Sequence, residues 1–328
     1  MGIRGARMEG LASAVPERVL TNLDLEKMVE TSDQWIFSRT GIRERRILEP
    51  GQGASDLAAR SARQTLEKTG VSPLDLDLII VATVTPDSPL PASSCLVQAQ
   101  LGAVNAAAFD LVAGCSGFVY ALSVGSQYVQ SGLYSRVLII GVDICSSFVD
   151  WKDRSTCVLF GDGAGSCLLQ PGEQGEGVLA ATLGADGSCS RFLYVEAGGS
   201  KKPASPETVA LGQHYVKMAG NEVFKHAVRE MESSMMRCLK QCGLTKEDLD
   251  LVVPHQANMR IIDTLRRRMG LAEDQVLVNI HRYGNTSAAS IPIALEEADR
   301  NGKLKKGMIL GLTSFGAGLT WASAVIRW

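Results

Sequence analysis

The sequence lacks the features that mark metal-binding, membrane-spanning and nucleic-acid-binding proteins. Its eight cysteines form no Cys-x-x-Cys pair, and no stretch approaches the roughly 20 apolar residues that span a bilayer. The 33 basic and 35 acidic side chains leave a net charge of -2, so the chain as a whole is not drawn to nucleic acid or to an anionic membrane. We therefore expect no metal, no nucleic-acid partner and no membrane association.

The N-terminus carries no pattern of a targeting segment. Residues 1–6 lack an apolar stretch, and Ala6 does not fit a myristoylation motif. Cysteines without a secretory signal are typical of free thiols in a reducing compartment. Cys238 and Cys242 are spaced four residues apart but have no further ligand nearby, so we interpret them as ordinary thiols. The sequence predicts a cytoplasmic protein.

The chain is long enough, at 328 residues, for two domains or one duplicated unit, and it repeats itself. Three pairs of segments match in the same order at an offset of about 170 residues: 66–80 with 239–253, Gly114-Cys115-Ser116 with Gly284-Asn285-Thr286, and 137–141 with 308–312. Three collinear matches indicate a tandem duplication, which we divide into residues 1–172 and 173–328.

Each half alternates apolar runs of strand length, such as 78–84 and 137–142, with amphipathic helical patterns. This alternation is typical of buried, mostly parallel sheets covered by helices, so we predict an α/β fold. If the halves pack about a pseudo-twofold axis, Cys115 and Asn285 occupy equivalent positions and meet near His255 at the shared centre.

Cys115 is the candidate nucleophile. The run 109–114 before it is strand-like, the run after it is helix-like, and small residues on both sides permit a sharp turn. A helix N-terminus lowers the pKa of a thiol, so we expect a reactive thiolate. The run alone leaves open that Cys115 is a small buried core residue.

His255 and Asn285 are the candidate partners of this cysteine. Of the four histidines, His255 alone directly follows an apolar strand, where α/β sheets place functional groups. Asn285 follows Gly284 at an expected helix start, where a plain helix cap is an equal alternative. The same run, Asn285-Thr-Ser, fits a glycosylation sequon, which we discount because no secretory signal precedes it.

Two further stretches have competing interpretations. The run Phe160-Gly-Asp-Gly-Ala-Gly165 mimics a dinucleotide loop but leads into a strand rather than a helix, so we interpret it as a turn with close backbone packing. Basic residues gather on or near a helix that begins after Asn258, and such a face either is merely solvated or receives phosphates and acidic proteins. They are Arg260, Arg266, Arg267 and Arg268, with Lys225 on another helix.

Seven motifs occur in order over nearly the whole chain: Trp35-Ile-Phe-Ser-Arg39-Thr-Gly-Ile-Arg-Glu-Arg45, Ala113-Gly-Cys115-Ser-Gly-Phe118, Phe160-Gly-Asp-Gly-Ala-Gly165, Met218-Ala-Gly-Asn-Glu-Val-Phe224, Pro254-His255-Gln-Ala-Asn258, Gly284-Asn285-Thr-Ser-Ala-Ala-Ser290 and Phe315-Gly-Ala-Gly-Leu-Thr-Trp321. Together they resemble the β-ketoacyl-[acyl-carrier-protein] synthase III family of thiolase-like condensing enzymes. The resemblance implies a thiolase-like fold, five-layered αβαβα, with two duplicated halves. It also implies an acyltransferase that initiates fatty acid synthesis, with a coenzyme A thioester as substrate and no cofactor.

The resemblance implies that an acyl-CoA primer acylates Cys115, after which malonyl-acyl carrier protein loses CO2 and its enolate attacks the acyl group. His255 and Asn285 would stabilise the enolate through hydrogen bonds. The backbone N–H groups of Cys115 and Ala317 would hold the oxyanion of acyl transfer. Phe315 would crowd the malonyl carboxylate and favour its loss.

Binding residues and a homodimer are implied in the same way. Coenzyme A would contact Trp35, Arg39, Arg154 and Asn258, and the carrier protein would contact Lys225, Arg260, Arg267 and Arg268. The primer pocket would include Phe160 and Leu90, the latter on a loop, residues 87–91, that crosses a dimer interface in the family. Leu90 and Ala317 stand where some relatives carry Phe and Gly, and residues 196–213 match loosely, so primer length and branching stay open.

Three alternatives remain at this point. A secondary-metabolite member of the same family would use a non-acetyl primer or another acceptor. A plant-type polyketide synthase also uses cysteine, histidine and asparagine, but in a longer chain. A non-catalytic binding subunit would usually lack the nucleophile, which this sequence retains in Cys115.

Overall fold

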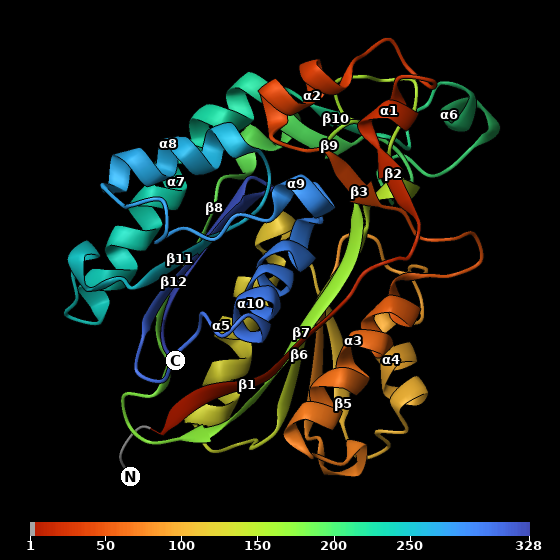
Figure 1. The fold of residues 1–328 in the computed structure, drawn as a ribbon. Coiled ribbons are helices and arrows are strands. Elements are labelled where there is room, and N and C mark those ends of the chain that lie inside the picture. Colours follow the sequence, from red (N-terminus) through yellow and green to blue (C-terminus); the bar gives the residue numbers. More distant parts are fainter. Residues whose placement is uncertain (1–3) are drawn as a thin grey trace.

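The computed structural model describes residues 4–328, and its central feature is a mixed sheet of nine strands (Figure 1). In spatial order the strands are β11 (Leu251–Pro254), β12 (Ile309–Gly316), β13 (Thr320–Arg327), β8 (Gly177–Ala185), β1 (Gly5–Ala14), β7 (Asp162–Gly172), β6 (Val137–Ile144), β4 (Leu78–Ala82) and β5 (Ala107–Leu111). β1 and β8 are joined by one parallel residue pair, so the sheet divides naturally there.

The two parts of the sheet repeat the same connections. β4 runs parallel to β6, β6 antiparallel to β7, and β7 antiparallel to β1. In the second part β11 runs parallel to β12, β12 antiparallel to β13, and β13 antiparallel to β8. The edge strand β5 is matched by a parallel bridge between Val252 of β11 and Val276. The duplication predicted from the sequence is present in the topology. We propose residue 172/173 as the boundary, between β7 and β8.

Helices on both outer faces of the sheet and between its two parts complete five layers (Figure 1). α3 (Ala54–Thr69) and α4 (Ser93–Leu101) cover the outer face of the first part, and α7 (Gly220–Gln241) and α8 (Met259–Met269) cover the outer face of the second. α5 (Gly117–Gln130) and α10 (Ser290–Arg300) lie between the two parts. The predicted αβαβα thiolase-like architecture is confirmed.

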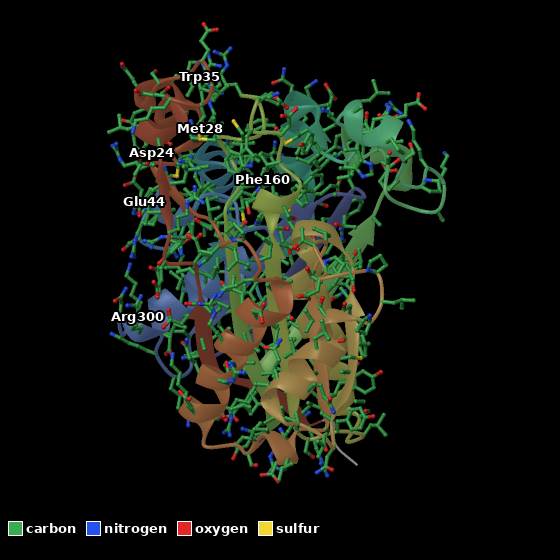
Figure 2. All side chains as sticks on the ribbon, turned by 90° about the vertical axis from the view of Figure 1, so that its right-hand side faces the viewer. Asp24, Met28, Trp35, Glu44, Phe160 and Arg300 are labelled. Atoms are coloured by element: carbon green, nitrogen blue, oxygen red, sulfur yellow. The ribbon has the colours of Figure 1, made fainter. Side chains whose placement is uncertain are left out.

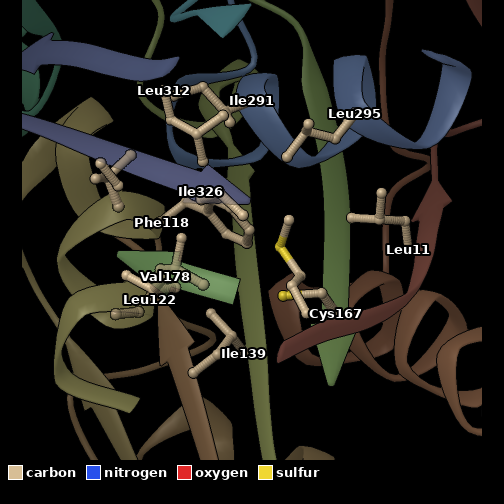
Figure 3. Packing of buried hydrophobic residues seen from close by; sticks show 14 of the residues in the cluster. Leu11, Phe118, Leu122, Ile139, Cys167, Val178, Ile291, Leu295, Leu312 and Ile326 are labelled. Atoms are coloured by element: carbon tan, nitrogen blue, oxygen red, sulfur yellow. The ribbon is translucent and has the colours of Figure 1, made fainter. Parts of the chain in front are cut away.

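The largest core fills the space between the two parts of the sheet (Figure 3). Phe118 and Leu122 of α5 project into it, where they meet apolar side chains of strands from both halves and of α10: Ile139, Val178, Leu295, Leu312 and Ile326. Replacing a buried Phe by Ala typically costs about 3–5 kcal/mol. This packing fixes the starts of α5 and α10, and therefore the residues just before them.

A cap of short elements covers one end of the sheet, at the top of Figure 1. It contains α1 (Asn22–Leu25), α2 (Asp33–Thr40), α6 (Pro206–Ala210), α9 (Ile280–Tyr283) and the two-stranded sheets β2 (Val19–Thr21) with β3 (Glu44–Arg46) and β9 (Leu193–Val195) with β10 (Val216–Met218). Its own core includes Leu25, Ile36, Ile42 and Val158. Within residues 4–328, no helix combines the length and the apolar character that crossing a bilayer requires.

Candidate active site

Cys115, His255 and Asn285 line a single cavity of about 830 Å³ between the cap and the sheet. Cys115 lies in a 3-10 turn, Gly114–Ser116, that joins β5 to α5. His255 directly follows β11, and Asn285 lies between α9 and the 3-10 turn Ser287–Ala289 that leads into α10. The structure therefore brings together the three side chains that the sequence predicted.

Cys115 and Asn285 occupy equivalent places in the two halves. Each follows a glycine in the left-handed region, Gly114 with φ 57° and Gly284 with φ 65°, and each precedes a central helix. A Cβ at Gly114 would lie 2.8 Å from the backbone nitrogen of Ala317, so only glycine fits. The repeated turn explains why a nucleophile and an amide donor converge from distant parts of the sequence.

The end of β12 forms the wall behind the nucleophile. A Cβ at Gly316 would overlap the backbone of Cys115, so the two backbones touch directly. Phe315 is buried at 4% exposure and lines the cavity. Ala317 does not line the cavity with its side chain, but its backbone nitrogen lies beside Gly114.

The Cys115 thiol is neutral rather than ionised, which corrects the expectation of a thiolate. Burial raises the pKa of Cys115 to about 12, the nearby Asp143 adds to the rise, and the hydroxyl of Ser287, which donates to Sγ at 3.3 Å, opposes it. The expectation relied on a helix N-terminus, but α5 begins only at Gly117, beyond the 3-10 turn. Desolvation is therefore the largest influence on this thiol.

His255 is neutral as well, because burial lowers its pKa to about 3. Its Nδ1 lies 2.6 Å from Oγ of Ser290, and that oxygen also accepts a hydrogen bond from the N–H of Gln256 at 3.3 Å. When the imidazole carries its proton on Nε2, Nδ1 accepts the hydroxyl proton of Ser290. In that tautomer Nε2 is a donor.

Ser290 was not predicted from the sequence. It stands at the start of α10, where a serine is an ordinary helix-start residue. Only the tertiary contact with His255 gives it a role.

Asn285 is held by three hydrogen bonds to backbone atoms around it. Its backbone N–H donates to the carbonyl of Leu159 at 2.8 Å, and its carbonyl accepts from Gly161 at 3.0 Å. Its Oδ1 accepts from the N–H of Ser287 at 2.9 Å, which leaves the Nδ2 amide as the donor end. The Phe160–Gly165 run is closely packed, as predicted, but it is not a turn, because Asp162–Gly165 already forms the start of β7. Phe160 itself lines the cavity.

Comparisons with known proteins point to one family. The family models of 3-oxoacyl-[acyl-carrier-protein] synthase III match residues 109–187 and, for the C-terminal part, 239–328. The chain is 55% identical to the β-ketoacyl-[acyl-carrier-protein] synthase III of Caldanaerobacter subterraneus subsp. tengcongensis, covering 97% of this chain and 96% of the relative. It is also 55% identical to the protein of the same name from Symbiobacterium thermophilum, covering 100% and 99%.

A crystal structure of 3-oxoacyl-[acyl-carrier-protein] synthase III from Aquifex aeolicus VF5 superposes with a TM-score of 0.91 at 45% identity, covering 99% of this chain and 100% of that one. The chain belongs to the synthase III family. It is therefore a condensing enzyme of the acyltransferase class, and Cys115, His255 and Asn285 line its cavity together.

The mouth of the synthase's cavity carries the four residues expected to bind coenzyme A. The guanidinium groups of Arg39 and Arg154 lie 4.5 Å and 4.9 Å from the ring centroid of Trp35, and Arg154 donates to the carbonyl of Glu30 at 2.9 Å. Asn258 caps α8. Figure 2 shows Trp35 at the outer end of the molecule and Phe160 deeper within it. All four expected residues and Phe160 line the cavity.

The basic residues and Leu90 differ in their position relative to the cavity. Arg260 and Arg267 line the mouth of the cavity. Lys225 and Arg268 lie outside it, paired with Glu222 at 2.7 Å and with Glu232 at 2.6 Å respectively. Leu90 is 86% exposed and does not line the cavity of its own chain. Among residues 4–328, no three side chains of His, Cys, Asp or Glu cluster as a metal site would require.

Proposed function

We propose that this synthase condenses an acyl-CoA primer with malonyl-acyl carrier protein, releasing CO2 and forming a 3-ketoacyl-carrier protein as the first step of fatty acid synthesis. The observation that carries the proposal is the convergence of a thiol, a neutral imidazole and a carboxamide, Cys115, His255 and Asn285, on one cavity. Its mouth offers an aromatic ring and guanidinium groups, which suit an adenine ring and phosphates.

In the first half-reaction Sγ of Cys115 attacks the thioester carbonyl of the primer and the bond to the coenzyme A sulfur breaks. The thiol proton of Cys115 ends on that sulfur, so coenzyme A leaves as a thiol. The backbone nitrogen of Ala317 lies beside Gly114 and that of Cys115 beside Gly316, and their N–H groups would hold the carbonyl oxygen as it becomes an oxyanion. Such donors are worth about 3 kcal/mol each because they act where charge develops. A thiol is both a strong nucleophile and a good leaving group, so the acyl-enzyme forms and later breaks down.

In the second half-reaction the malonyl thioester loses CO2, and negative charge moves onto its thioester oxygen. Nε2 of His255 and Nδ2 of Asn285 are the donors that would stabilise this enolate. Neither donor changes charge near neutral pH, since His255 has a pKa of about 3 and an amide does not titrate. The ring of Phe315 would crowd the carboxylate and favour its departure.

These steps are a nucleophilic substitution, a decarboxylation and a second substitution. The side chains and N–H groups named above assist each of them directly. We therefore propose that the synthase uses coenzyme A thioesters as substrate and works without a resident cofactor. The carrier protein, an acidic partner, would dock on the arginines of α8, of which Arg260 and Arg267 border the cavity.

We also propose that the synthase is a cytoplasmic homodimer. β5 forms the edge of the sheet, and none of its five residues is buried, whereas every residue of its neighbour β4 is. Apolar side chains flank this edge in the open: Leu90, Val104 and Val112 are 86%, 72% and 75% exposed. Such an edge and patch favour pairing with a second copy. The cytoplasmic location is supported by the cysteines, which are free thiols throughout residues 4–328.

Mass spectrometry after incubation with acetyl-CoA tests the proposal. We expect one acetyl adduct, on Cys115, and none in Cys115→Ala, which also loses condensation. His255→Ala and Asn285→Ala should still acetylate themselves but decarboxylate malonyl-carrier protein at least about 100-fold more slowly, since each loses an enolate donor. An acetyl group found on another cysteine, with Cys115 unmodified, contradicts the assignment of the nucleophile.

A further inference from the structure

Ser287 is the one residue other than glycine, among residues 4–328, whose backbone lies in the left-handed region, with φ 50°. An L-residue rarely adopts this conformation unless its surroundings impose it, and such residues cluster at functional sites. Ser287 is 3% exposed and opens the 3-10 turn that leads into α10. Its conformation is therefore imposed by the contacts around it.

The backbone N–H and the side-chain hydroxyl of Ser287 both face the catalytic residues. Its backbone N–H donates to Oδ1 of Asn285 at 2.9 Å, and its hydroxyl donates to Sγ of Cys115 at 3.3 Å. Ser287 does not line the cavity, so it approaches the sulfur from the protein side and leaves the substrate side open. A single left-handed residue thus links the nucleophile to the amide donor.

A buried carboxyl group stands behind this serine. Asp143 of β6 has no exposure and accepts hydrogen bonds from Thr83, Thr85, the N–H of Val84 and the N–H of Ala288, and it also contacts the Ser287 hydroxyl. The hydroxyl proton of Ser287 therefore has two acceptors, Sγ and the carboxyl. It can turn toward Asp143 while Sγ is protonated and toward Sγ when the sulfur is charged.

We propose that Ser287 is a catalytic residue whose hydroxyl stabilises the negative charge of Sγ in both half-reactions. The charge is present when the sulfur attacks the primer thioester and coenzyme A leaves. It appears again when the enolate carbon bonds to the acyl group and the Cys115 sulfur leaves, and it is lost when that sulfur takes up a proton from water. The inference rests on the proposed function for these steps, but the hydrogen bond to the sulfur does not depend on the identity of the substrate.

The groups that influence the thiol come from several elements. Asp143 raises the pKa of Cys115, and Ser287 is the side chain that lowers it. The Cys145 thiol is buried nearby, with its own pKa raised by burial and by Asp143, so it stays neutral. His255 shares the cavity but is neutral with a pKa of about 3. Removing the Ser287 hydroxyl therefore moves the pKa of Cys115 further upward.

The test is the rate at which iodoacetamide alkylates Cys115, measured against pH in two variants. Ser287→Ala and Ser287→Gly both remove the hydroxyl, and glycine tolerates φ 50° without strain. We expect alkylation at a given pH to fall about tenfold or more in both, with the profile shifted to higher pH, because a hydrogen bond to a charged group is lost. Self-acetylation by acetyl-CoA should fall in parallel.

Ser116→Ala is the matched control. Its hydroxyl is also buried and is adjacent to Cys115, yet Ser116 Oγ has no hydrogen-bond partner within residues 4–328. Its alkylation rate should equal that of the wild type. Wild-type rates and an unshifted profile in Ser287→Gly would overturn the proposal, even if Ser287→Ala fails to fold. If alkylation slows in both variants but the wild type makes no 3-ketoacyl product, the proposed function fails while the role of the hydroxyl stands.

Discussion

At the scale of single residues, catalysis depends on the protonation state of each buried group. His255 faces the cavity as a neutral ring, and in the tautomer with the proton on Nε2 its Nδ1 accepts the hydroxyl proton of Ser290. Because the pKa of His255 is lowered to about 3, its native form does not take up a proton as pH falls through its usual range near 6.5. The imidazole therefore remains the same hydrogen-bond donor from neutral to mildly acidic pH.

We predict that Ser290→Ala slows decarboxylation of malonyl-carrier protein about tenfold, because either imidazole tautomer then becomes accessible. Self-acetylation of Cys115 should stay near the wild-type rate, since Ser290 contacts His255 and not the sulfur. Ser290→Thr keeps the hydroxyl and should recover most of the loss. Separate assays of acetylation and decarboxylation check this, and an equal loss in both would indicate general disruption of the site.

The sequence identifies Cys115, His255 and Asn285 because each follows a strand or a turn that recurs in the duplicated halves. The sequence does not identify Ser287 and Ser290 as functional residues, since serines in a Ser/Ala run are ordinary at a helix start. Their roles come from contacts with residues far away along the chain. The expected thiolate at Cys115 was wrong for the same reason: sequence reveals a nearby helix start but not the depth of burial that outweighs it.

At the scale of secondary-structure elements, α8 combines a buried apolar face with a row of arginines. Ile261, Ile262 and Leu265 pack against α7 and the sheet, which turns Arg260 and Arg267 toward the mouth of the cavity. The helix thus presents positive charge at the mouth of the cavity, where we propose that the carrier protein docks. Such rim charges act mainly on association and on its salt dependence.

We predict that Arg260→Ala and Arg267→Ala each raise KM for malonyl-carrier protein several-fold, roughly 3- to 10-fold, and weaken its dependence on ionic strength. The rate of decarboxylation at saturation should change little. Arg237→Ala is the control, because Arg237 lies on α7 in a different groove and bonds Ser233. An equal rise in KM for all three variants would show that overall charge, not this helix face, governs docking.

The strands and long helices of the duplicated halves were predictable because their apolar residues follow a clear pattern along the sequence. The expected strands 78–84 and 137–142 correspond to β4 (Leu78–Ala82) and β6 (Val137–Ile144). The cap was not predictable, since its paired strands are three residues long and carry no period. Buried Arg45 shows why: it joins β3 to Leu20, Asn22 and Val158 through hydrogen bonds that only the folded chain brings together.

At the scale of the whole molecule, the sheet ends differently on its two sides. At one edge of the sheet, Val252 of β11 pairs with Val276 through a parallel bridge. At the other edge, β5 remains partly exposed. The same edge leads directly into the turn that carries Cys115. A partner at β5 would therefore also buttress the nucleophile and cover the loop of Leu90.

We predict that sedimentation velocity of the wild type gives the mass of a dimer, and that Val104→Asp or Val112→Asp shifts it to the 35.1 kDa monomer. Each change places a charge in the exposed apolar face beside β5, where burial against a second copy would leave it unpaired. Met236→Asp is the control, since Met236 is 41% exposed on α7, which covers the other half of the molecule. If the wild type sediments as a monomer, or if all three variants stay dimeric, β5 is not the dimer edge and the partner's Leu90 cannot reach the primer pocket.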